Sequence, residues 1–551
     1  MWRTIGALGA MAAVALSQGV GGARSGVLRA AAPRGEPLAV DAAPSAKAPE
    51  LWLYLSTNLL VDENVAKAQA LLQRAARAGY ARVVLADVKL SRLDEVGERY
   101  VANVRRFLAT AREAKVRVVP ALFPIGYSEG LLHHDPNLAE ALPARGVRFV
   151  VADGAARVEA QAQPLRAPEW KDDCWREEAP GAWRCTAPNG NARVVFRVKV
   201  KPWHPYHVAL TVETRDFGGE PRAQALVGER ALIHSNLGAA RTQPPTRHHA
   251  VFNSFEHEEV RIYLGAWGAA GGELAIRDAT LEVAGLVNLV RRDGAPFEVR
   301  DAKGRRLVEG RDYQPVSDPG MGVTPWKGSF DVWHEPPAIA TRLPDGTALD
   351  VSFHHVVTIH DGQVMICPSE PATLALLERE VHDIAELFGR EAFFLSHDEI
   401  RVLNQDEACR RRGLDAGALL ADHVAACSAL VRKEAPRAEQ WIWSDMFDPH
   451  HNARADYYLV RGDLTGSWEG LPKEVGIAAW YFEQRAQSLP FFAQRGHPLL
   501  IAGYYDGPVA AIDEWLAAGR AAGGVAAVMY TTWQQRYDDL EAFAERVRAA
   551  K

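Results

Sequence analysis

Two adjacent carboxylates, Asp398 and Glu399, stand just after the apolar run 393–395. The run has the length and composition of a short buried strand, so the two acids are expected where that strand ends. Neighbouring residues at a strand end point in different directions. One carboxylate could therefore protonate a leaving group while the other binds a different atom. The alternative is a structural role, in which Asp398 only caps the segment that follows.

Polar and aromatic residues recur at the ends of other predicted strands. These strand-end residues are Asp87, Arg401, Trp443, Ser444, Asp445, Trp480, Glu483, Tyr504, Tyr505, Asp506, Tyr530, Trp533 and Gln535. Aromatic rings stack on sugar faces, and a carboxyl group in a partly apolar site keeps the proton that a glycosidic oxygen needs. Such a group of residues favours a saccharide substrate. Aromatics that merely cover the core would explain some of the rings, but not the acids that alternate with them.

Eight apolar runs, most of them followed by helical patterns, supply the strands that would position these side chains. The predicted strands are 51–55, 83–87, 116–122, 393–397, 440–443, 476–480, 499–503 and 525–530. Eight parallel strands close a (β/α)₈ TIM barrel, whose chemistry lies at the C-terminal strand ends. An open doubly wound sheet competes, but no glycine-rich phosphate loop follows the first strand. The barrel would comprise residues 49–150 and 367–551.

The alternation of strands and helices breaks off after the third predicted strand. Residues 165–290 form short runs of alternating apolar and polar residues separated by turns, and residues 291–366 continue as hairpins. This pattern predicts an inserted antiparallel β-sandwich of the jelly-roll type, similar to a carbohydrate-binding module. The sandwich either binds sugar, through Trp203 or Trp267, or packs against the barrel and builds one wall of its cleft.

The N-terminus has the pattern of a secretory signal. Arg3 precedes an apolar segment at 5–16 and small residues at 21–23, which predicts a signal peptide over 1–23 and a disordered linker over 24–48. An uncleaved anchor is the alternative. The net charge of −6 is spread along the chain, with no basic patch for nucleic acid. We expect a secreted or periplasmic protein with no stable membrane insertion after cleavage; the oligomeric state is open.

The five cysteines allow two disulfides in an exported protein. Cys174 and Cys185 bracket a short stretch that suits a disulfide-closed hairpin. Cys409 and Cys427 could pair across a loop and the following helix, which would leave Cys367 over. Spacing alone establishes neither pair. No Cys-x-x-Cys motif or His/Cys cluster predicts a zinc site, so we expect neither a metal nor a cofactor.

The barrel segments resemble glycoside hydrolase family 20, the β-N-acetylhexosaminidases. The resemblance rests on Leu395-Ser396-His397-Asp398-Glu399, the loop Cys409-Arg410-Arg411-Arg412-Gly413, Trp441-Ile442-Trp443-Ser444-Asp445-Met446, Tyr504-Tyr505-Asp506 and Trp533-Gln534-Gln535. Residues 123–128 stand in the place of the family's Pro-Gly-His loop. The similarity covers roughly residues 50–145 and 370–550, and it does not cover the sandwich.

The resemblance implies a mechanism in which the substrate's own acetamido oxygen attacks the anomeric carbon. Glu399 would be the acid and base, Asp398 would orient the acetamido group, and Tyr504 would stabilise the intermediate. The expected substrate-binding residues are Asp506, Trp443, Asp445, Trp480, Trp533, Gln535, Arg401 and Tyr127. Adjacent carboxylates suffice for this chemistry, whereas an ordinary retaining glycosidase needs two carboxyls about 5 Å apart on opposite faces of the bond.

Three positions depart from the family pattern. Residues 56–58 replace the arginine after the first strand, Tyr127 replaces a histidine, and Gln535 replaces a glutamate. In the family these positions contact the non-reducing end of the sugar. The departures are therefore compatible with endo action or with a modified amino sugar.

Two other functions stay open. One is a glycosidase for a sugar without the acetamido group, with Asp445 or Glu483 as the second carboxylate. The other is a non-catalytic glycan-binding protein built on a degenerate barrel, which the altered pocket residues favour and the Asp398-Glu399 pair disfavours.

Overall fold

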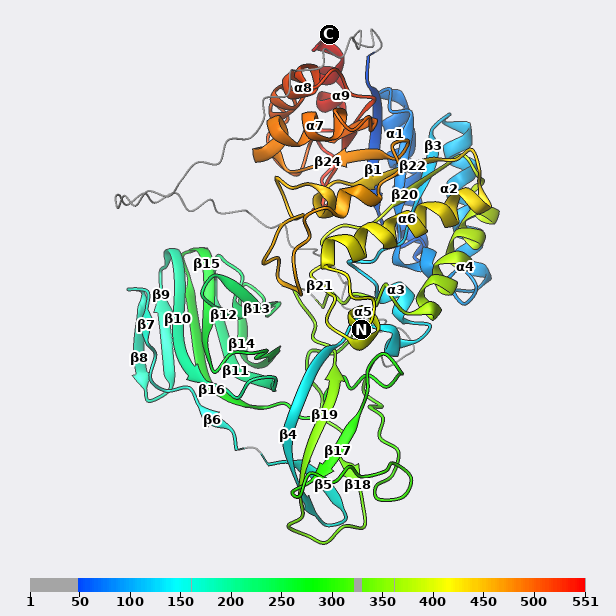
Figure 1. Cartoon of the computed structure of the whole chain (residues 1–551). Helices are drawn as coiled ribbons and strands as arrows, with labels where there is room; N and C mark the ends of the chain where they lie inside the picture. The colour runs from blue at the N-terminus through cyan, green and yellow to red at the C-terminus, as the bar shows by residue number, and fades with distance from the viewer. Residues whose placement is uncertain (1–47, 160, 322–329, 361, 551) are drawn as a thin grey trace, which may run out of the picture.

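The computed structural model describes residues 48–159, 161–321, 330–360 and 362–550. The predicted signal peptide and all but the last residue of the predicted linker lie outside the described residues. Within the described part, no helix is long and apolar enough to cross a membrane. The described chain forms a barrel, a β-sandwich and a smaller β-sheet (Figure 1).

Eight parallel strands close the barrel, which confirms the predicted fold class. In order around it they are β1 (Glu50–Ser56), β2 (Arg82–Ala86), β3 (Arg117–Leu122), β20 (Ala392–Leu395), β22 (Glu439–Trp443), β24 (Gly476–Ala479), β25 (Leu499–Ala502) and β26 (Ala527–Tyr530). β26 returns to β1, with Trp52 opposite Met529. All C-terminal strand ends therefore face the same mouth of the barrel.

The two faces of each barrel strand are buried in different cores. Trp52 of β1 and Phe394 of β20 point into the barrel, whereas Leu53 and Leu395 pack outward with the helix layer. This period of two is why the strands read as unbroken apolar runs. It also means that the residue just past each strand end emerges at the mouth.

Among the described residues, seven helices cover the outside of the barrel. They are α1 (Asp62–Arg77), α2 (Glu98–Glu113), α4 (Pro371–Phe388), α6 (Ala416–Glu434), α7 (Arg485–Ala493), α8 (Ala511–Ala521) and α9 (Leu540–Ala549). α1 shows why they form, since Val65, Ala68 and Leu72 fall on one buried face at helical spacing. α4 is the helix that follows β3, delayed by the whole insertion.

The inserted sandwich has two antiparallel sheets, as predicted. One contains, in order, β13 (Arg230–Asn236), β12 (Arg222–Val227), β15 (Glu259–Ala270), β10 (Asn189–Lys199) and β7 (Trp170–Lys171). The other contains β14 (Gln243–Asn253), β11 (Pro205–Arg215), β16 (Glu273–Val283), β9 (Ala182–Thr186) and β8 (Trp175–Ala179), with β6 (Gln163–Pro164) beside β16. Trp183 of β9 meets Phe196 of β10, with ring centroids 5.3 Å apart, so the core lies between the sheets.

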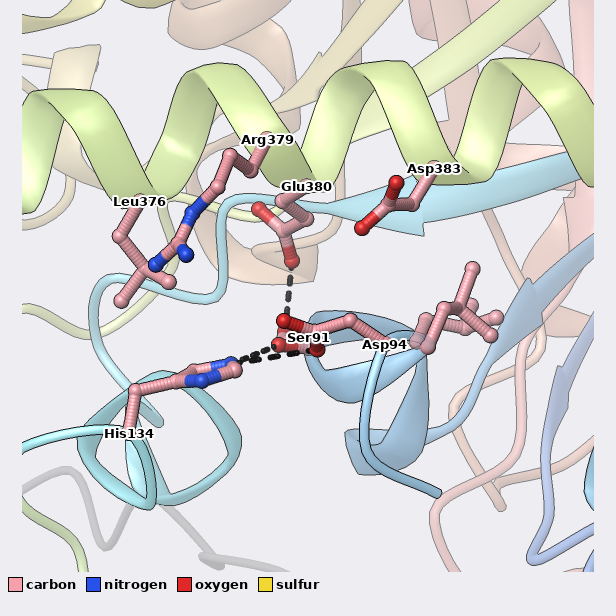
Figure 2. A pocket seen from close by; sticks show the side chains of 9 residues that line it. Ser91, Asp94, His134, Leu376, Arg379, Glu380 and Asp383 are labelled. Carbon is pink, nitrogen blue, oxygen red and sulfur yellow. Dashed lines mark hydrogen bonds and ion pairs between the residues drawn. The ribbon is translucent and has the colours of Figure 1, made fainter. Parts of the chain in front are cut away.

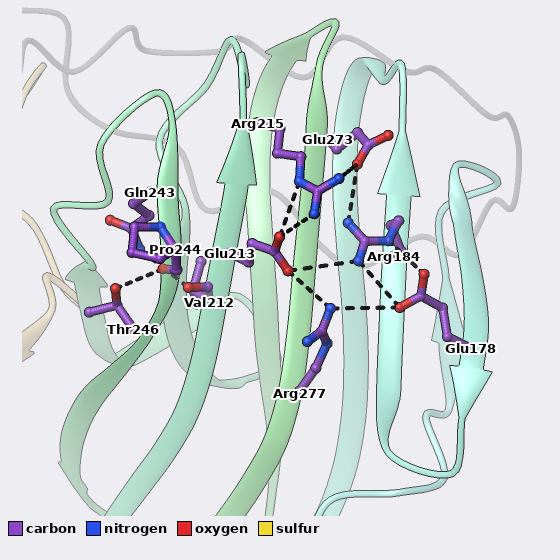
Figure 3. A network of polar contacts seen from close by, with 10 residues as sticks. All are labelled: Glu178, Arg184, Val212, Glu213, Arg215, Gln243, Pro244, Thr246, Glu273 and Arg277. Atoms are coloured by element: carbon purple, nitrogen blue, oxygen red, sulfur yellow. Dashed lines mark hydrogen bonds and ion pairs between the residues drawn. The ribbon is translucent and has the colours of Figure 1, made fainter.

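Charged side chains cover the outer face of the β11-β16-β9 sheet (Figure 3). The network consists of Glu178, Arg184, Glu213, Arg215, Glu273 and Arg277. Arg184 Nε lies 2.6 Å from Glu178, and Arg277 lies 3.0 Å from Glu213. Cross-strand charge pairs of this kind suit a face turned to solvent.

The two tryptophans considered for sugar binding have different surroundings. Trp203 packs on Phe255 at 5.9 Å, with the Arg145 guanidinium 3.9 Å above its ring. Trp267 lies half-buried on β15, in the sheet that contains β12 and β10, with its ring centroid 6.3 Å from that of Tyr263. Only Trp267 therefore belongs to an aromatic row on a sheet face.

A smaller antiparallel sheet joins the sandwich to the barrel. Its strands, in order, are β17 (Glu298–Asp301), β19 (Ala348–His355), β4 (Leu142–Ala152), β5 (Ala155–Val158) and β18 (Ile339–Ala340). β4 pairs with β19 and β5 and with no barrel strand. The expectation that the barrel's first part reaches residue 150 is therefore wrong, because the chain has left the barrel by residue 142.

One of the two proposed disulfides forms. Cys174 and Cys185 are joined across the β8-β9 hairpin. The pairing of Cys409 with Cys427 is wrong. Cys409 lies 3.6 Å from the Cys367 sulfur, and Cys427 lies against His423 on α6. The loop after β20 turns Cys409 toward the start of α4, away from the inner face of α6.

Candidate active site

The backbone of Glu399 is fixed in an unusual conformation just past β20. Its φ is +50°, in the left-handed region that costs a non-glycine residue about 1 kcal/mol. Its N–H donates to Asp445 Oδ2 at 2.8 Å, and its C=O accepts from Gln363 Nε2 at 3.0 Å. These bonds hold the residue so that its side chain stays 21% exposed. Such retained strain is common at functional sites.

Both carboxyl oxygens of Glu399 have partners. Arg401 Nη2 lies 2.6 Å from Oε1, and the Tyr127 hydroxyl donates to Oε2. Arg401 is buried, donates also to Gln363 and lies beneath the Tyr458 ring. The short strands β21 (Val402–Leu403) and β23 (Leu459–Val460) pair beside it and fix its backbone. The structure thus brings Arg401 and Tyr127 to the predicted site.

Three carboxyl groups, those of Asp398, Glu399 and Asp445, lie close enough to interact electrostatically. Burial, with the charges of Asp445 and Glu399, raises the pKa of Asp398 well above its usual range. Burial and the neighbouring Glu399 raise the pKa of Asp445 to about 7, against the lowering effect of its hydrogen bonds. Carboxyl groups that cannot all ionise together retain a proton near neutral pH.

Asp445 accepts hydrogen bonds from one backbone group and two side chains. It begins the 3-10 helix η3 (Asp445–Phe447) and is fully buried. Its oxygens accept hydrogen bonds from the Glu399 N–H, from Asn452 Nδ2 at 3.0 Å and from Trp480 Nε1 at 3.4 Å. With these partners it positions Glu399 and Trp480, whereas the sequence predicted a sugar contact.

Aromatic rings from four strand ends surround the acids. Trp480 stacks on Tyr505 with centroids 5.4 Å apart and planes 7° from parallel. Trp533 meets Tyr505 edge-on at 6.0 Å and Tyr54 at 5.2 Å. Trp480 and Trp533 are half-buried at the mouth, whereas Trp443 is buried beneath them against Tyr54 and Trp533. Trp443 therefore forms the floor of this aromatic cluster.

The two tyrosines after β25 point to different places. The Tyr504 hydroxyl donates to Asp539 Oδ2 at 2.7 Å, and its ring stacks on Tyr530. Tyr504 thus faces away from the acids, contrary to the role expected for it. Tyr505 has a left-handed φ of +51°, which turns the backbone and brings its ring to Trp480. Burial and the charge of Glu399 raise the pKa of Tyr505.

Three further strand-end residues contact backbone groups of the loops, and the substrate-binding roles predicted for Asp506 and Gln535 stay predictions. Asp506 accepts from the Trp533 N–H at 2.7 Å and the Gln534 N–H at 3.2 Å, so it shapes the loop after β26. Gln535 is exposed, and its Nε2 lies 3.5 Å from the Ser56 carbonyl. Asp87 accepts from backbone N–H groups and caps the 3-10 helix η1 (Val88–Arg92).

Several residues of the site were missed by sequence reasoning. Gln363, which holds both Glu399 and Arg401, comes from the end of the insertion, far from any barrel strand. Asn452 comes from the loop after η3. Tyr54 carried a usable signal, because it is an inward residue of β1. Burial and the charge of Asp398 raise its pKa, so it lies near the acids.

A small pocket lies on the outside of the barrel (Figure 2). It lies between η1 and α4, where Ser91 Oγ donates to Glu380 at 2.6 Å and His134 lies 2.9 Å from the Ser91 carbonyl. Burial raises the pKa of Glu380 to about 7. Its second oxygen accepts from the Phe123 N–H, at the start of the loop that carries Tyr127.

Two buried groups of side chains have atom types that bind metals. One comprises His397, His423 and Cys427, and the other comprises Glu140, Cys367, Asp406 and Cys409. Ligand atoms within each group lie within 4.8 Å of one another. The sequence did not predict either group, because each gathers residues from separate elements. The spacing of four between His423 and Cys427 on α6 was the one local signal.

These observations define a (β/α)₈ barrel with an inserted β-sandwich and an acidic, aromatic-lined mouth. No family model and no curated protein matches the chain. Among solved structures, the chitobiase of Flavobacterium johnsoniae matches with 10% identity and a TM-score of 0.38, over 92% of this chain and 48% of the other. The chain thus spans about half the length of that protein.

Two further structures match parts or most of the chain. A glycoside hydrolase family 20 exo-β-N-acetylglucosaminidase from Vibrio harveyi, in complex with N-acetylglucosamine, has 9% identity and a TM-score of 0.38, over 91% of this chain and 54% of the other. A family 6 carbohydrate-binding module of a laminarinase from Zobellia galactanivorans has 12% identity and a TM-score of 0.18, over 23% of this chain and 99% of the other.

Proposed function

We propose that the chain is a glycoside hydrolase that cleaves the glycosidic bond of an N-acetyl-amino sugar, with the substrate's acetamido oxygen as nucleophile. The observation that carries the proposal is the Asp398-Glu399 pair at the end of β20. Glu399 is partly exposed, and the stacked Trp480 and Tyr505 stand beside it. Rings and acids together suit a pyranose.

The surroundings of the pair favour substrate assistance over a second protein carboxylate. A conventional retaining enzyme needs a nucleophile about 5 Å from the acid on the opposite face of the bond. Asp445 is a poor candidate, because it is fully buried and its oxygens accept three hydrogen bonds. Glu483, on η5 (Phe482–Gln484), is exposed and is the remaining candidate for that runner-up.

Within the proposal, Glu399 is the acid and base, Asp398 orients the acetamido group, and Tyr505 replaces Tyr504 as the stabiliser of the intermediate. The two carboxyl oxygens of Glu399 contact Arg401 and Tyr127. To protonate a leaving group, Glu399 must exchange one of these partners for the substrate. The remaining partner would then hold its second oxygen.

The test compares phenyl N-acetyl-β-glucosaminide and β-galactosaminide, whose phenol leaving group needs a proton, with the same phenyl glycosides lacking the acetamido group. We expect hydrolysis only of the acetamido substrates, lost by at least about 100-fold in Glu399→Gln and nearly unchanged in Glu483→Gln. Release from the plain glycosides, abolished by Glu483→Gln, would establish the runner-up instead. Glycan binding without turnover of any substrate would make the chain a binding protein.

Two leaving groups would separate the roles of the acidic pair. A dinitrophenyl leaving group needs no protonation, whereas a sugar leaving group does. We expect Glu399→Gln to retain activity on the dinitrophenyl glycoside and lose it on a disaccharide. Asp398→Asn should lose both, because the acetamido group is then not oriented. The opposite pattern would assign the acid role to Asp398.

Export to the periplasm or the medium is part of the same proposal. The Cys174–Cys185 disulfide supports it, because such bonds persist in oxidising compartments. Mass spectrometry of the protein recovered from each cell fraction tests it. Cleavage near residue 23 and recovery outside the cytoplasm are expected; an intact N-terminus in the cytoplasm would contradict export.

A further inference from the structure

Three buried side chains converge between β20 and α6. His397 is the second residue after the end of β20. Its ring centroid lies 5.5 Å from that of His423. His423 and Cys427 are one helical turn apart on α6, with Nε2 and Sγ 3.5 Å apart. None of the three side chains is more than 2% exposed. The cluster faces the inner side of the helix layer, separate from the barrel mouth.

His397 is the anomaly in this cluster. Neither of its ring nitrogens has a hydrogen-bond partner among the described residues, although the ring is fully buried. An unpaired buried polar atom costs about 1–3 kcal/mol, so two on one ring need an explanation. The ring is directed at His423 and Cys427, which carry a nitrogen and a sulfur toward it.

We infer that His397, His423 and Cys427 bind a late first-row divalent cation, most simply Zn²⁺, between β20 and α6. Tetrahedral zinc with bonds of about 2.0–2.1 Å to nitrogen and 2.3 Å to sulfur places those ligand atoms about 3.5 Å apart. His423 and Cys427 already stand at 3.5 Å. Imidazole nitrogen and thiolate sulfur are both ligand types that zinc takes.

Binding needs two neutral imidazoles, which burial favours, and a thiolate, which burial opposes. Burial lowers the pKa of His397 far below its usual value and that of His423 to about 4, so both imidazoles are neutral and offer lone pairs. Burial raises the pKa of the Cys427 thiol, so without metal it keeps its proton. On binding, the thiol releases that proton to water and a sulfur–metal bond forms.

The charges of the neighbouring groups also suit a cation. A thiolate and a divalent ion leave one positive charge, and the buried carboxyl of Glu380 is close enough to influence Cys427 electrostatically. The other buried group is different, because Arg292 already lies 2.5 Å from Asp406 and supplies the positive charge there.

A cation at this position would fix the chain just before the acidic pair. His397 is the residue that precedes Asp398, so a metal bond would tie the exit of β20 to α6. His397 acts on the reaction only through that tie, as a positioning residue. The main expected effect of metal loss is therefore on stability, with a smaller effect on turnover.

Metal content and cobalt substitution of the full chain test the inference. Mass spectrometry should find about one zinc per chain after refolding or growth with zinc. Cobalt in its place should give the near-ultraviolet thiolate-to-cobalt absorption and the visible bands of a tetrahedral site. Cys427→Ser and His423→Gln should each lose the thiolate absorption or the metal. The matched control is Cys409→Ser, a buried cysteine of the other group, which should retain both.

Three results would overturn the inference. No bound metal in the unmodified chain at micromolar zinc, or cobalt bound without thiolate absorption, would overturn the inference. Loss of the signal in Cys409→Ser with retention in Cys427→Ser would move the site to the other group and overturn it as well. If Cys427→Ser fails to fold, the cobalt spectrum of the unmodified chain still decides. Glycosidase activity plays no part in these readouts, so failure of the proposed function leaves them unaffected.

Discussion

Around Glu399, single residues divide into those that hold backbone and those that face the barrel mouth. Asp445 and Asp506 accept hydrogen bonds from backbone N–H groups of neighbouring loops. Trp480 and Tyr505 offer a stacked pair of rings instead. A carboxylate at a strand end is thus weak evidence of sugar contact, because the loops there also need acceptors for their own N–H groups.

The neighbouring tyrosines give a residue-scale prediction for activity. Tyr505→Phe should lower kcat/KM by about 10- to 100-fold, because it removes a hydroxyl near the acids that could stabilise developing charge. Tyr504→Phe should lower it by less than about 3-fold, since that hydroxyl bonds Asp539 away from the acids. Steady-state kinetics on an N-acetyl-β-glucosaminide measures both. A larger loss in Tyr504→Phe would restore the role that the sequence gave to Tyr504.

Glu129, on α3 (Glu129–Leu132), gives a residue-scale prediction for pH. Burial raises its pKa from 4.5 to about 7. The folded state therefore binds its proton more tightly than the unfolded state does, and this group's contribution to stability falls as pH rises from about 4.5 to about 7. Glu129→Gln has no carboxyl group at this position, so it does not undergo this fall in stability with rising pH. Its free energy of unfolding should match wild type at pH 4 and exceed it by about 1–3 kcal/mol at pH 8.

Denaturant unfolding at several pH values measures this difference. Glu113→Gln, at the exposed end of α2, is the control for the loss of a carboxyl group from a helix. A pH-independent effect of Glu129→Gln would show that the buried carboxyl does not titrate in this range.

At the scale of elements, the site depends on two loops that approach each other closely. The loop after β3 carries Tyr127, and the loop after β20 carries Asp398 and Glu399. They meet at Gly126, where an added Cβ would overlap the Asp398 carbonyl oxygen. The Ile125 N–H also donates to the Ser396 carbonyl at 3.2 Å. Packing at Gly126 therefore determines how far Asp398 and Glu399 lie from the ends of the barrel strands.

Gly126→Ala tests this contact between the loops. The methyl group has to push the Asp398 carbonyl aside, so we expect a loss of about 1–3 kcal/mol of stability and at least about 10-fold in kcat/KM. Gly507→Ala is the control at the same mouth, because its Cβ would meet only ordinary contacts. Equal kinetics for wild type and Gly126→Ala would show that the two loops can separate without consequence.

At the scale of the whole molecule, the insertion completes the site. Its last segment brings Gln363 under Glu399 and Arg401. The sandwich is tied to the same region, since Arg230 Nε donates to the Tyr458 carbonyl at 3.1 Å and the His360 N–H donates to the His234 carbonyl at 2.8 Å. The insertion therefore packs against the barrel at its mouth, whatever the sandwich binds.

Gln363→Leu tests the contribution of the insertion. It leaves the Glu399 carbonyl and the Arg401 guanidinium each short of a partner, so kcat/KM should fall by about 10- to 100-fold. Ser352→Ala on β19 is the control, because its hydrogen bond to Gly146 stays within the small sheet. Unchanged kinetics in Gln363→Leu would mean that the barrel alone positions the acids.

The local pattern of apolar and polar residues was enough to predict the architecture. Apolar runs of strand length, helical faces such as Val65, Ala68 and Leu72, and the switch to short alternating runs predicted the barrel and the inserted sandwich. The same patterns placed Asp398 and Glu399 at a strand end. These features depend on the burial of nearby residues with a period of two or of 3.6, which a linear sequence displays directly.

The tertiary structure alone decided which residues meet. Gln363 reaches Glu399 from the insertion, Cys409 lies against Cys367 rather than Cys427, and Tyr505 rather than Tyr504 joins the rings. Left-handed backbone conformations at loop residues and contacts across long stretches of chain set these outcomes. Neither leaves a periodic trace in the sequence, because each depends on how separate elements pack.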